Sequence, residues 1–437
     1  MVDDPTDFDV VVVGAGPAGA AAALVLARAG RSVCLLERGP FPGSKNMYGG
    51  VVYPRVLDEL LPAWWEEAPV QRWVTRRATM MLTGTQSLTV DYRTGTWGRP
   101  PYNGATALRP DFDRWLAGKA VDAGATLLCD TTASGLLGGG SEPVRGVRTD
   151  RPAGDLTASM VIACDGVNSF LAKEAGLYGT IDPGNYTLGA KEVLALDAEV
   201  IDARFGLQRS EGADFEILGC TEGIPGGGFL YTNRASVAVG VVVRLPELGA
   251  SGKRPEALIA GLKNHPAVAP LVAGGELIEY SAHLIPEAGL SMVPQLAGDG
   301  ILVAGDAAGL CLAAGIWLEG VNFAIASGAA AGQCANEAIG TGDMSASGLA
   351  GYRRRLEKSF VLADHRKLRR APHLVLSERM QHRYPELVCN LMEAMFTVTN
   401  PTPKRGAVSL ARQEARRSGL RMRHLARDAW DALRTFG

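Results

Sequence analysis

Apolar and polar positions along the first 40 residues predict a strand, a helix and a second strand. Residues 10–13 form an unbroken run of valines, which is typical of a parallel strand buried on both faces. A stretch rich in Ala and Leu then extends to Ala29, where Gly30 suits the C-terminal cap of a helix. Residues 32–36 make a second strand that ends at Glu37. The pattern therefore predicts a β-α-β unit.

The loop between the first strand and the helix has the glycine spacing of a dinucleotide site. It consists of Gly14, Ala15, Gly16, Pro17, Ala18 and Gly19. Gly14 would allow the tight turn, Gly16 would let the backbone approach a pyrophosphate, and Gly19 would let helix and strand pack closely. The helix N-terminus favours the negative charge of phosphates. Glu37 follows at roughly the 20-residue spacing expected for a carboxylate that binds a ribose hydroxyl.

Two later apolar runs also end in an acid and a glycine. Residues 160–164 lead into Asp165 and Gly166, and residues 300–304 lead into Gly305 and Asp306. Such positions lie at the strand ends where open α/β sheets bind ligands. A glycine loop and an Ala-rich helix from Phe323 follow the second run. Asp306 could then hydrogen-bond a ribityl chain while the helix N-terminus faces the flavin ring, so we expect the dinucleotide to be FAD.

The remaining segments predict further domains. Residues 51–104 indicate strands and a helix, a second helix begins near residue 107 with Asp111 as a possible cap, and residues 176–290 alternate as antiparallel strands do. The predicted fold is α/β, with a discontinuous Rossmann-like FAD-binding domain, a smaller α+β substrate domain and a helical C-terminal region. The FAD-binding segments are 1–42, 105–175 and 291–345. The others are 43–104 (a loop over the flavin ring and the first part of the substrate domain), 176–290 (the rest of that domain) and 346–437 (helical and basic).

Composition narrows the function classes. The 437 residues suffice for two or three domains, and the formal net charge of −2 argues against nucleic acid as the main partner. The seven cysteines stand singly without CxxC spacing, so we expect no metal or iron–sulfur site in the chain, and the odd count suits a reducing cytoplasm. The most apolar long stretch, residues 300–332, is interrupted by Asp306, Glu319 and Asn322 and offers no span of about 20 apolar residues.

The C-terminal tail predicts a basic amphipathic helix. One stripe consists of Leu425, Ala429, Leu433 and Phe436, and the basic counterpart consists of Arg416, Arg421, Arg423 and Arg427. Such a helix can lie on an anionic membrane or dock an acidic partner. A solvated surface helix that covers the core is the plainer alternative.

Together these residues resemble the FAD proteins of the p-hydroxybenzoate-hydroxylase-type fold, in which GxGxxG…ER, a middle Asp-Gly and a late Gly-Asp occur in this order. Within that fold the chain resembles the FixC branch, the bacterial electron-transfer flavoprotein:quinone oxidoreductases. The matching stretches are GSKNMYGGVVYP at 43–54, GGFLYT at 227–232, LEGVNFAIASG at 318–328 and the segment 366–398 with its RRAPH and YPEL motifs. The resemblance implies an enzyme that takes electrons from an electron-transfer flavoprotein and passes them to a membrane quinone.

The resemblance also implies partners and a location. Long eukaryotic relatives carry a four-cysteine iron–sulfur domain after the flavin part, whereas Cys389 is the only cysteine after Cys334 here. The FixC branch uses a separate ferredoxin-like iron–sulfur protein, which we therefore expect. The smaller domain would be the quinone domain. Contact with the membrane surface would be monotopic, at the inner face of the cell membrane on the cytoplasmic side.

Roles of single residues follow from the resemblance. At the adenosine end of FAD, Glu37 and Arg38 would contact the ribose and a phosphate, and Arg109 would contact the phosphates. Asp165 and Gly166 would lie at the ribityl–pyrophosphate junction and Asp306 at the ribityl chain. At the flavin, Gly320, Val321 and Asn322 would meet the pyrimidine edge, and Lys45 and Asn46 would lie near the ring. The quinone would contact Phe229, Tyr231 and Trp317. No catalytic acid or base is assigned, because the flavin itself exchanges the electrons.

Three alternatives share the predicted fold or cofactor. A geranylgeranyl-reductase-like enzyme saturates a prenyl chain, but those relatives often have a cysteine in the loop that matches residues 43–50, and this loop has none. A flavin monooxygenase would use oxygen and NAD(P)H. A non-catalytic electron carrier would bind flavin without turning over any acceptor. Fold alone does not separate these functions.

Overall fold

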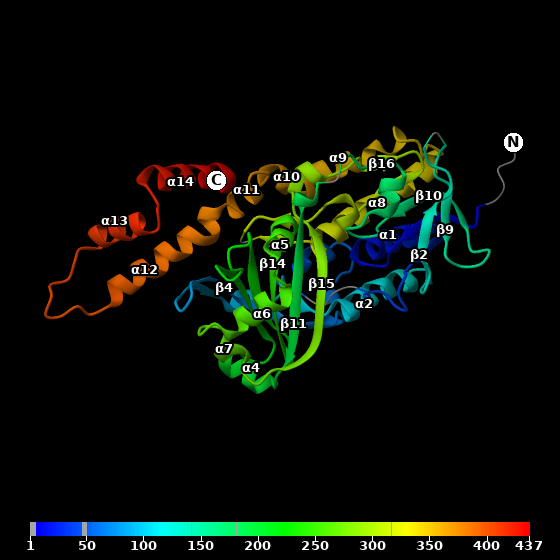
Figure 1. Cartoon of the computed structure of the whole chain (residues 1–437). Coiled ribbons are helices and arrows are strands. Elements are labelled where there is room, and N and C mark those ends of the chain that lie inside the picture. Colours follow the sequence, from blue (N-terminus) through cyan, green and yellow to red (C-terminus); the bar gives the residue numbers. More distant parts are fainter. Residues whose placement is uncertain (1–5, 46–49, 141, 181, 316) are drawn as a thin grey trace.

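The computed structural model describes residues 6–45, 50–140, 142–180, 182–315 and 317–437. Asn46, predicted to lie near the flavin ring, is outside these residues. Two large sheets form the body of the molecule, and the C-terminal helices extend away from them on the left of Figure 1.

The first sheet contains the predicted β-α-β unit. Its strand order is β16-β17-β10-β1-β2-β7, and β17, β10, β1, β2 and β7 are parallel. Val12 of β1 pairs with Ile162 on one side and Leu35 on the other, so the valine run is buried as predicted. The strands are β1 (Phe8–Val13), β2 (Val33–Leu36), β7 (Thr126–Leu128), β8 (Ala133–Leu136), β9 (Gly146–Thr149), β10 (Leu156–Ala163), β16 (Ala297–Gly298) and β17 (Ile301–Val303).

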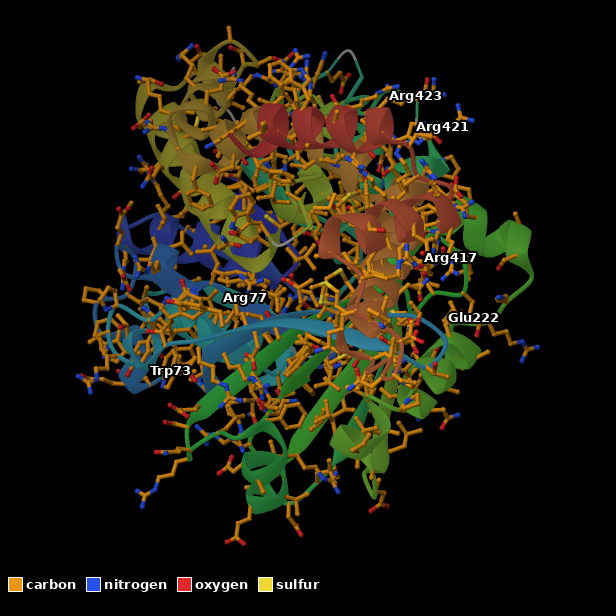
Figure 2. All side chains as sticks on the ribbon, turned by 90° about the vertical axis from the view of Figure 1, so that its left-hand side faces the viewer. Trp73, Arg77, Glu222, Arg417, Arg421 and Arg423 are labelled. Carbon is orange, nitrogen blue, oxygen red and sulfur yellow. The ribbon has the colours of Figure 1, made fainter. Side chains whose placement is uncertain are left out.

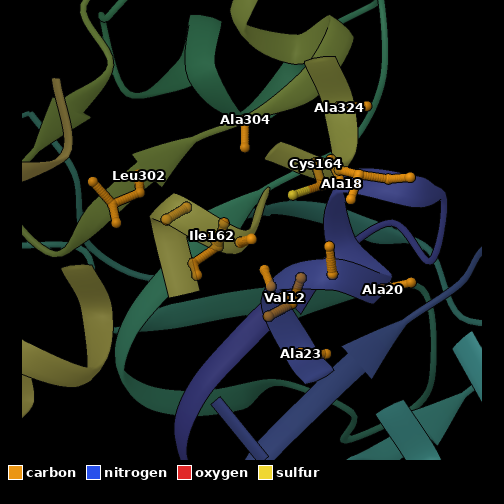
Figure 3. Packing of buried hydrophobic residues seen from close by; sticks show 14 of the residues in the cluster. Val12, Ala18, Ala20, Ala23, Ile162, Cys164, Leu302, Ala304 and Ala324 are labelled. Atoms are coloured by element: carbon orange, nitrogen blue, oxygen red, sulfur yellow. The ribbon is translucent and has the colours of Figure 1, made fainter. Parts of the chain in front are cut away.

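Helices α1 (Pro17–Arg28) and α8 (Val321–Thr341) pack together through small residues beside this sheet. A Cβ atom added at Gly328 of α8 would lie 1.9 Å from the backbone oxygen of Ala18, and one at Gly332 would lie 2.7 Å from that of Ala22. The two backbones therefore approach so closely that a side chain does not fit between them. Figure 3 shows alanines of both helices against residues of β1, β10 and β17.

The second sheet is mainly antiparallel and has the order β15-β11-β14-β13-β12-β4-β6-β3, with β5 paired to β4. Helix α6 covers one face, where Leu258, Ile259 and Leu262 join a core with Val239 and Val241. The strands are β3 (Gly50–Val52), β4 (Val70–Leu82), β5 (Ser87–Arg93), β6 (Ala105–Ala107), β11 (Tyr186–Ala195), β12 (Glu211–Leu218), β13 (Gly226–Thr232), β14 (Ser236–Arg244) and β15 (Glu276–Pro286). A separate two-stranded sheet pairs β18 (Leu312–Ala313) with β19 (Leu318–Glu319).

The other helices lie around the two sheets and in the C-terminal region. They are α2 (Arg109–Asp122), α3 (Phe170–Glu174), α4 (Ala198–Phe205), α5 (Leu245–Ser251), α6 (Pro255–Asn264), α7 (Ala269–Val272), α9 (Gly351–Lys358), α10 (Phe360–Lys367), α11 (Ala371–Val375), α12 (Tyr384–Phe396), α13 (Ala407–Arg417) and α14 (Met422–Phe436). None of the helices in the described part of the chain combines the length and the apolar character that crossing a bilayer requires.

Two local predictions are wrong. Asp111 is not the N-terminal cap of α2: Leu108 takes that position, and Asp111 lies in the first turn. The helix starts earlier because the proline after Arg109 suits the first turn of a helix. The expected α-helix within residues 51–104, all of which are described, does not form. The helical segments there are short 3₁₀ turns. The aromatic residues there pack on one another instead: the rings of Trp73 and Tyr102 stack with centroids 3.5 Å apart.

The predicted apolar stripe of α14 does not pack as one surface. Leu425 and Phe436 are partly buried, whereas Ala429 and Leu433 are exposed. The ion pair of Asp428 with Arg379 sets the rotation of the helix: Nε of Arg379 donates to Oδ2 of Asp428 at 2.5 Å, and Nη2 donates to Oδ1 at 2.6 Å. Asp428 is thereby buried and Leu433 is left 66% exposed.

Replacing Gly328 with Ala should destabilise the protein by about 1–3 kcal/mol, because the new methyl group overlaps the Ala18 backbone and overpacking costs energy of this size. Urea unfolding followed by circular dichroism measures the change. The control is Gly118→Ala in α2, where no heavy atom lies within 4 Å of the new Cβ and stability should be kept or should rise by up to about 1 kcal/mol. Equal effects of the two substitutions would contradict the proposed close packing of α1 and α8.

Candidate functional site

Four neighbouring strands of the first sheet end at one edge. Gly14 follows β1, Glu37 follows β2, Asp165 lies just beyond β10, and Asp306 lies just beyond β17. Because these strands are adjacent and parallel, the four positions meet where open α/β sheets bind ligands. All four residues line one cavity of about 930 Å³, which continues past this edge to the second sheet and the C-terminal region.

Most of the predicted site residues line this cavity: Gly14, Gly16, Pro17, Ala18, Glu37, Arg38, Lys45, Arg109, Asp165, Gly166, Phe229, Tyr231, Asp306, Trp317, Gly320 and Val321. Gly19, Gly305 and Asn322 do not form its wall. Gly305 supports the wall from behind: a Cβ there would lie 2.9 Å from that of Ala18, and its amide donates to Oγ of Ser327 at 3.0 Å.

The glycine loop has the geometry expected of a phosphate-binding turn. Gly14 has a φ of +98°, and a Cβ there would lie 2.3 Å from the backbone oxygen of Cys164. A Cβ at Gly19 would lie 1.9 Å from the oxygen of Gly14, so both positions require glycine. In front of Gly16 the nearest atom to an added Cβ is Nη2 of Arg109, at 3.7 Å.

The guanidinium of Arg109 is held in place by Asp113, whose two carboxylate oxygens accept from Nε and Nη2 at 2.7 Å each. It thus brings a positive charge beside the N-terminus of α1, where free amides also favour an anion. This combination suits a pyrophosphate.

Glu37 is positioned by backbone amides on both sides. The amide of Gly39 donates to Oε1 at 2.8 Å, and that of Ala15 donates to Oε2 at 3.3 Å. Burial raises the pKa of this carboxyl, and the two amides act in the opposite direction. The contacts join the end of β2 to the glycine loop, which places an acceptor beside the site predicted for the adenosine ribose.

The residues present fit a ligand that donates hydrogen bonds. Oδ2 of Asp165 accepts from the amide of Leu171 at 3.1 Å, whereas Oδ1 is buried and has no partner within the described residues. Burial also raises the pKa of this carboxyl. Since buried acceptors are normally satisfied, Oδ1 suits a donor from outside the chain. The hydroxyl groups of a ribityl chain are donors of this kind, so the cavity fits FAD.

The sequence patterns did not reveal the polar side chains that the second sheet contributes to the cavity. Asp214 and Glu216 of β12 and His283 of β15 line the cavity. The alternation Asp214-Phe215-Glu216, with Phe215 in the core on the opposite face, was a signal for the two acids. His283 stands in no motif. It lies near Asp306, and the two groups interact. Burial raises the pKa of Asp306, and the charge of His283 lowers it. Burial lowers the pKa of His283, and the charge of Asp306 raises it.

Comparison with known proteins places the chain in a family. Residues 7–206 match the family model "FAD binding domain", and residues 371–437 match "ETF-QO/FixC family C-terminal domain". A protein of Escherichia coli (strain K12) described as probable electron transfer flavoprotein-quinone oxidoreductase YdiS is 42% identical over 401 residues, which are 91% of this chain and 92% of the relative. The chain belongs to the FixC/ETF-QO family. The predicted family and the predicted cofactor, FAD, are confirmed.

Other relatives of this FixC-family protein agree. Protein FixC of Escherichia coli (strain K12) is 41% identical over 399 residues, with 91% of this chain and 92% of the relative covered. A solved geranylgeranyl bacteriochlorophyll reductase-like protein from Thermoplasma acidophilum superposes with a TM-score of 0.70 at 21% identity, over 93% of this chain and 95% of that chain. The myxobacterial halogenase CndH gives a TM-score of 0.65 at 17% identity, over 95% of this chain and 99% of that chain. These two likenesses confirm the fold and carry no conclusion on activity.

Replacing Asp165 with Ala should weaken FAD binding, because it removes the buried acceptor that the cofactor would satisfy. A hydrogen bond to a charged group contributes about 1.5–3 kcal/mol, so the FAD dissociation constant should rise about 10- to 100-fold. Flavin fluorescence titration of the apoprotein measures it. Asp122→Ala, at an exposed position of α2 away from the cavity, should leave the constant unchanged. Unaltered binding by the Asp165 variant would remove this residue from the FAD site.

Proposed function

We propose that this FixC-family protein accepts electrons from an electron-transfer flavoprotein at its FAD and passes them to a quinone. The observation that carries the proposal is the continuity of the cavity. It joins the strand edge suited to the dinucleotide to a chamber that holds Phe229, Tyr231 and Trp317. A flat, apolar electron acceptor would therefore reach the flavin without leaving the protein. The name of the Escherichia coli relative YdiS contains the same donor and acceptor.

The chamber suits a quinone ring in shape and chemistry. The rings of Phe229 and Tyr231 lie nearly parallel, with centroids 5.6 Å apart and an angle of 16° between their planes, and such faces favour stacking of a further ring. Val375, Leu376 and Met380 of the C-terminal region line the same cavity. Gln381 joins this region to the second sheet, because its Nε2 donates to the oxygen of Val375 at 2.7 Å and its Oε1 accepts from the amide of Gly226 at 3.3 Å.

The proposal includes a separate ferredoxin-like iron–sulfur protein. Within the described residues, no three His, Cys, Asp or Glu side chains are grouped so that they could hold a metal. A surface hollow of about 350 Å³ is lined only by basic residues: Arg366, Lys367, Arg369, Arg370 and Arg434. Opposite charge steers partners together, so this hollow supports docking of an acidic protein.

The proposal also includes monotopic contact with the inner face of the cell membrane. Trp430 and Leu433 of α14 are 61% and 66% exposed. Arg417, Arg421 and Arg423 gather at one edge of the C-terminal helices in Figure 2. Exposed apolar residues beside arginines are typical of helices that lie in the interface of an anionic membrane.

Anaerobic reduction of the FAD-loaded protein tests the electron path. NADH and NADPH should leave the flavin absorbance unchanged, a reduced electron-transfer flavoprotein should bleach it, and a soluble quinone should restore it. Rapid bleaching by NAD(P)H and better recovery with oxygen than with quinone would favour a monooxygenase. Saturation of a prenyl chain would favour the reductase, and full flavin binding with no acceptor turned over would favour a carrier.

Cosedimentation with vesicles that contain phosphatidylglycerol tests the membrane contact. The double substitution Trp430→Ser and Leu433→Ser should lower the bound fraction several-fold, because interfacial binding scales with buried apolar area. The matched control replaces Leu277 and Ile278 with Ser, two exposed apolar residues at the start of β15. Binding that survives the first pair of substitutions, or falls equally with the second, argues against α14 as the contact.

A further inference from the structure

Two carboxyl groups and an arginine share the cavity face of the second sheet with the stacked aromatic rings. Strand pairing places Glu216 opposite Thr79 of β4 and Phe229 of β13. It likewise places Asp214 opposite Arg77 and Tyr231. Side chains that are paired in this way point to the same face of a sheet. The two acids therefore lie directly beside the rings proposed to contact the quinone.

Arg77 bridges the two acids. Its Nη2 donates to Oε1 of Glu216, and its Nε lies 3.5 Å from Oδ2 of Asp214. The guanidinium also lies over the ring of Tyr53, 5.8 Å from the centroid. Figure 2 shows Arg77 in the interior, between the ribbons of the two halves of the molecule, whereas Glu222 in the turn between β12 and β13 lies at the outside.

The charges of this cluster do not balance when both acids are ionised, since one guanidinium faces two carboxylates. The side chains of Glu216 and Asp214 are only 16% and 9% exposed, and an uncompensated charge at such positions is costly. Burial, joined by the charge of Asp214, raises the pKa of Glu216 to about 8 despite Arg77. Burial raises the pKa of Asp214 to about 6. The raised pKa values of both acids favour retention of a proton by the pair near neutral pH.

Among the described residues, the charges that act on Glu216 are that of Asp214, which raises its pKa, and that of Arg77, which lowers it. Tyr53 follows β3, Tyr231 belongs to β13, and Glu319 belongs to β19. Burial raises the pKa of Tyr53 and that of Glu319, so these groups favour neutral forms as well. The cavity thus holds a carboxyl group that keeps its proton near neutral pH and faces the chamber proposed for the quinone.

We propose that Glu216 donates a proton to the quinone during its reduction, that Arg77 is a positioning residue for the carboxyl group, and that the charge of Asp214 favours the protonated form. The inference rests on the proposed function. Reduction of a quinone to a quinol takes two electrons and two protons. Bound reduced FAD would supply both electrons and one proton and would itself be oxidised. The second proton comes from Glu216: its O–H bond breaks as an O–H bond forms on the quinone oxygen. The carboxylate then regains a proton from solvent.

The substitution Glu216→Gln tests the proton donation, because glutamine keeps the size of the side chain and cannot supply the proton. FAD-loaded enzyme is reduced anaerobically with dithionite and then mixed with either a soluble quinone or ferricenium, an acceptor that takes electrons without protons. General acid catalysis contributes about 10²- to 10⁴-fold, so oxidation by quinone should slow about 100-fold or more. Oxidation by ferricenium should stay within about twofold of wild type.

The matched control is Glu222→Gln, the same substitution at an exposed acid whose Oε2 accepts from Nζ of Lys253 at 2.5 Å. It should behave as wild type with both acceptors. The pH dependence gives a second readout. Because Glu216 is protonated below a pKa of about 8 and ionised above it, the wild-type quinone rate should fall as pH rises through this value. The Glu216→Gln rate should show no such break.

Two further measurements keep the inference testable if that variant loses FAD. Asp214→Asn removes a charge that raises the pKa of Glu216, so the break should move to lower pH. Infrared spectra of the oxidised wild type should show a protonated carboxyl band that disappears above pH about 8 and is missing in Glu216→Gln.

Wild-type rates in Glu216→Gln, an equal slowing with quinone and ferricenium, or an unshifted break in Asp214→Asn would overturn the donor role. If quinone fails to oxidise the wild-type flavin while ferricenium succeeds, the proposed function fails, and the donor role fails with it.

Discussion

Close backbone contacts around the glycine loop fix how β1, α1, α8 and β10 pack together. Gly14 approaches the end of β10, Gly19 approaches Gly14, and Gly328 brings α8 onto α1 at Ala18. None of these positions has room for a side chain. Because the helices sit so close, their N-termini and the ends of four parallel strands face one volume. The glycine loop, α1 and α8 owe their positions at the cavity to this packing.

The second sheet and the C-terminal region extend that volume into a chamber. The sheet contributes aromatic rings and a buried group of ionisable residues, and the segment around Gln381 closes the wall from the other side. The chamber therefore combines two environments. Near the glycine loop, amides and Arg109 suit the phosphates of a dinucleotide, whereas the far end is largely apolar and holds a carboxyl group that favours its neutral form.

Local patterns predicted β1, β2, β10 and β17 of the first sheet, because each of these strands ends at a glycine or an acid with a definite geometric task. Gly14, Asp165 and Asp306 could be placed from the chain alone for this reason. The acids of β12 could not be placed with the same ease, since their role depends on pairing with β4 and β13, which lie far away in the sequence. The rotation of α14 was missed for a similar reason: it depends on the ion pair of Asp428 with Arg379, which apolar periodicity does not reveal.

We propose that one cavity holds FAD at the strand edge and a quinone in the chamber beside it. A crystal structure of the FAD-loaded protein with a tailless quinone analogue would show whether both ligands bind there. We predict the pyrophosphate at the N-terminus of α1 beside Arg109, and the analogue between the flavin ring and the side chains of Phe229, Tyr231 and Glu216. An analogue bound outside this chamber, or a flavin ring turned away from it, would contradict the account.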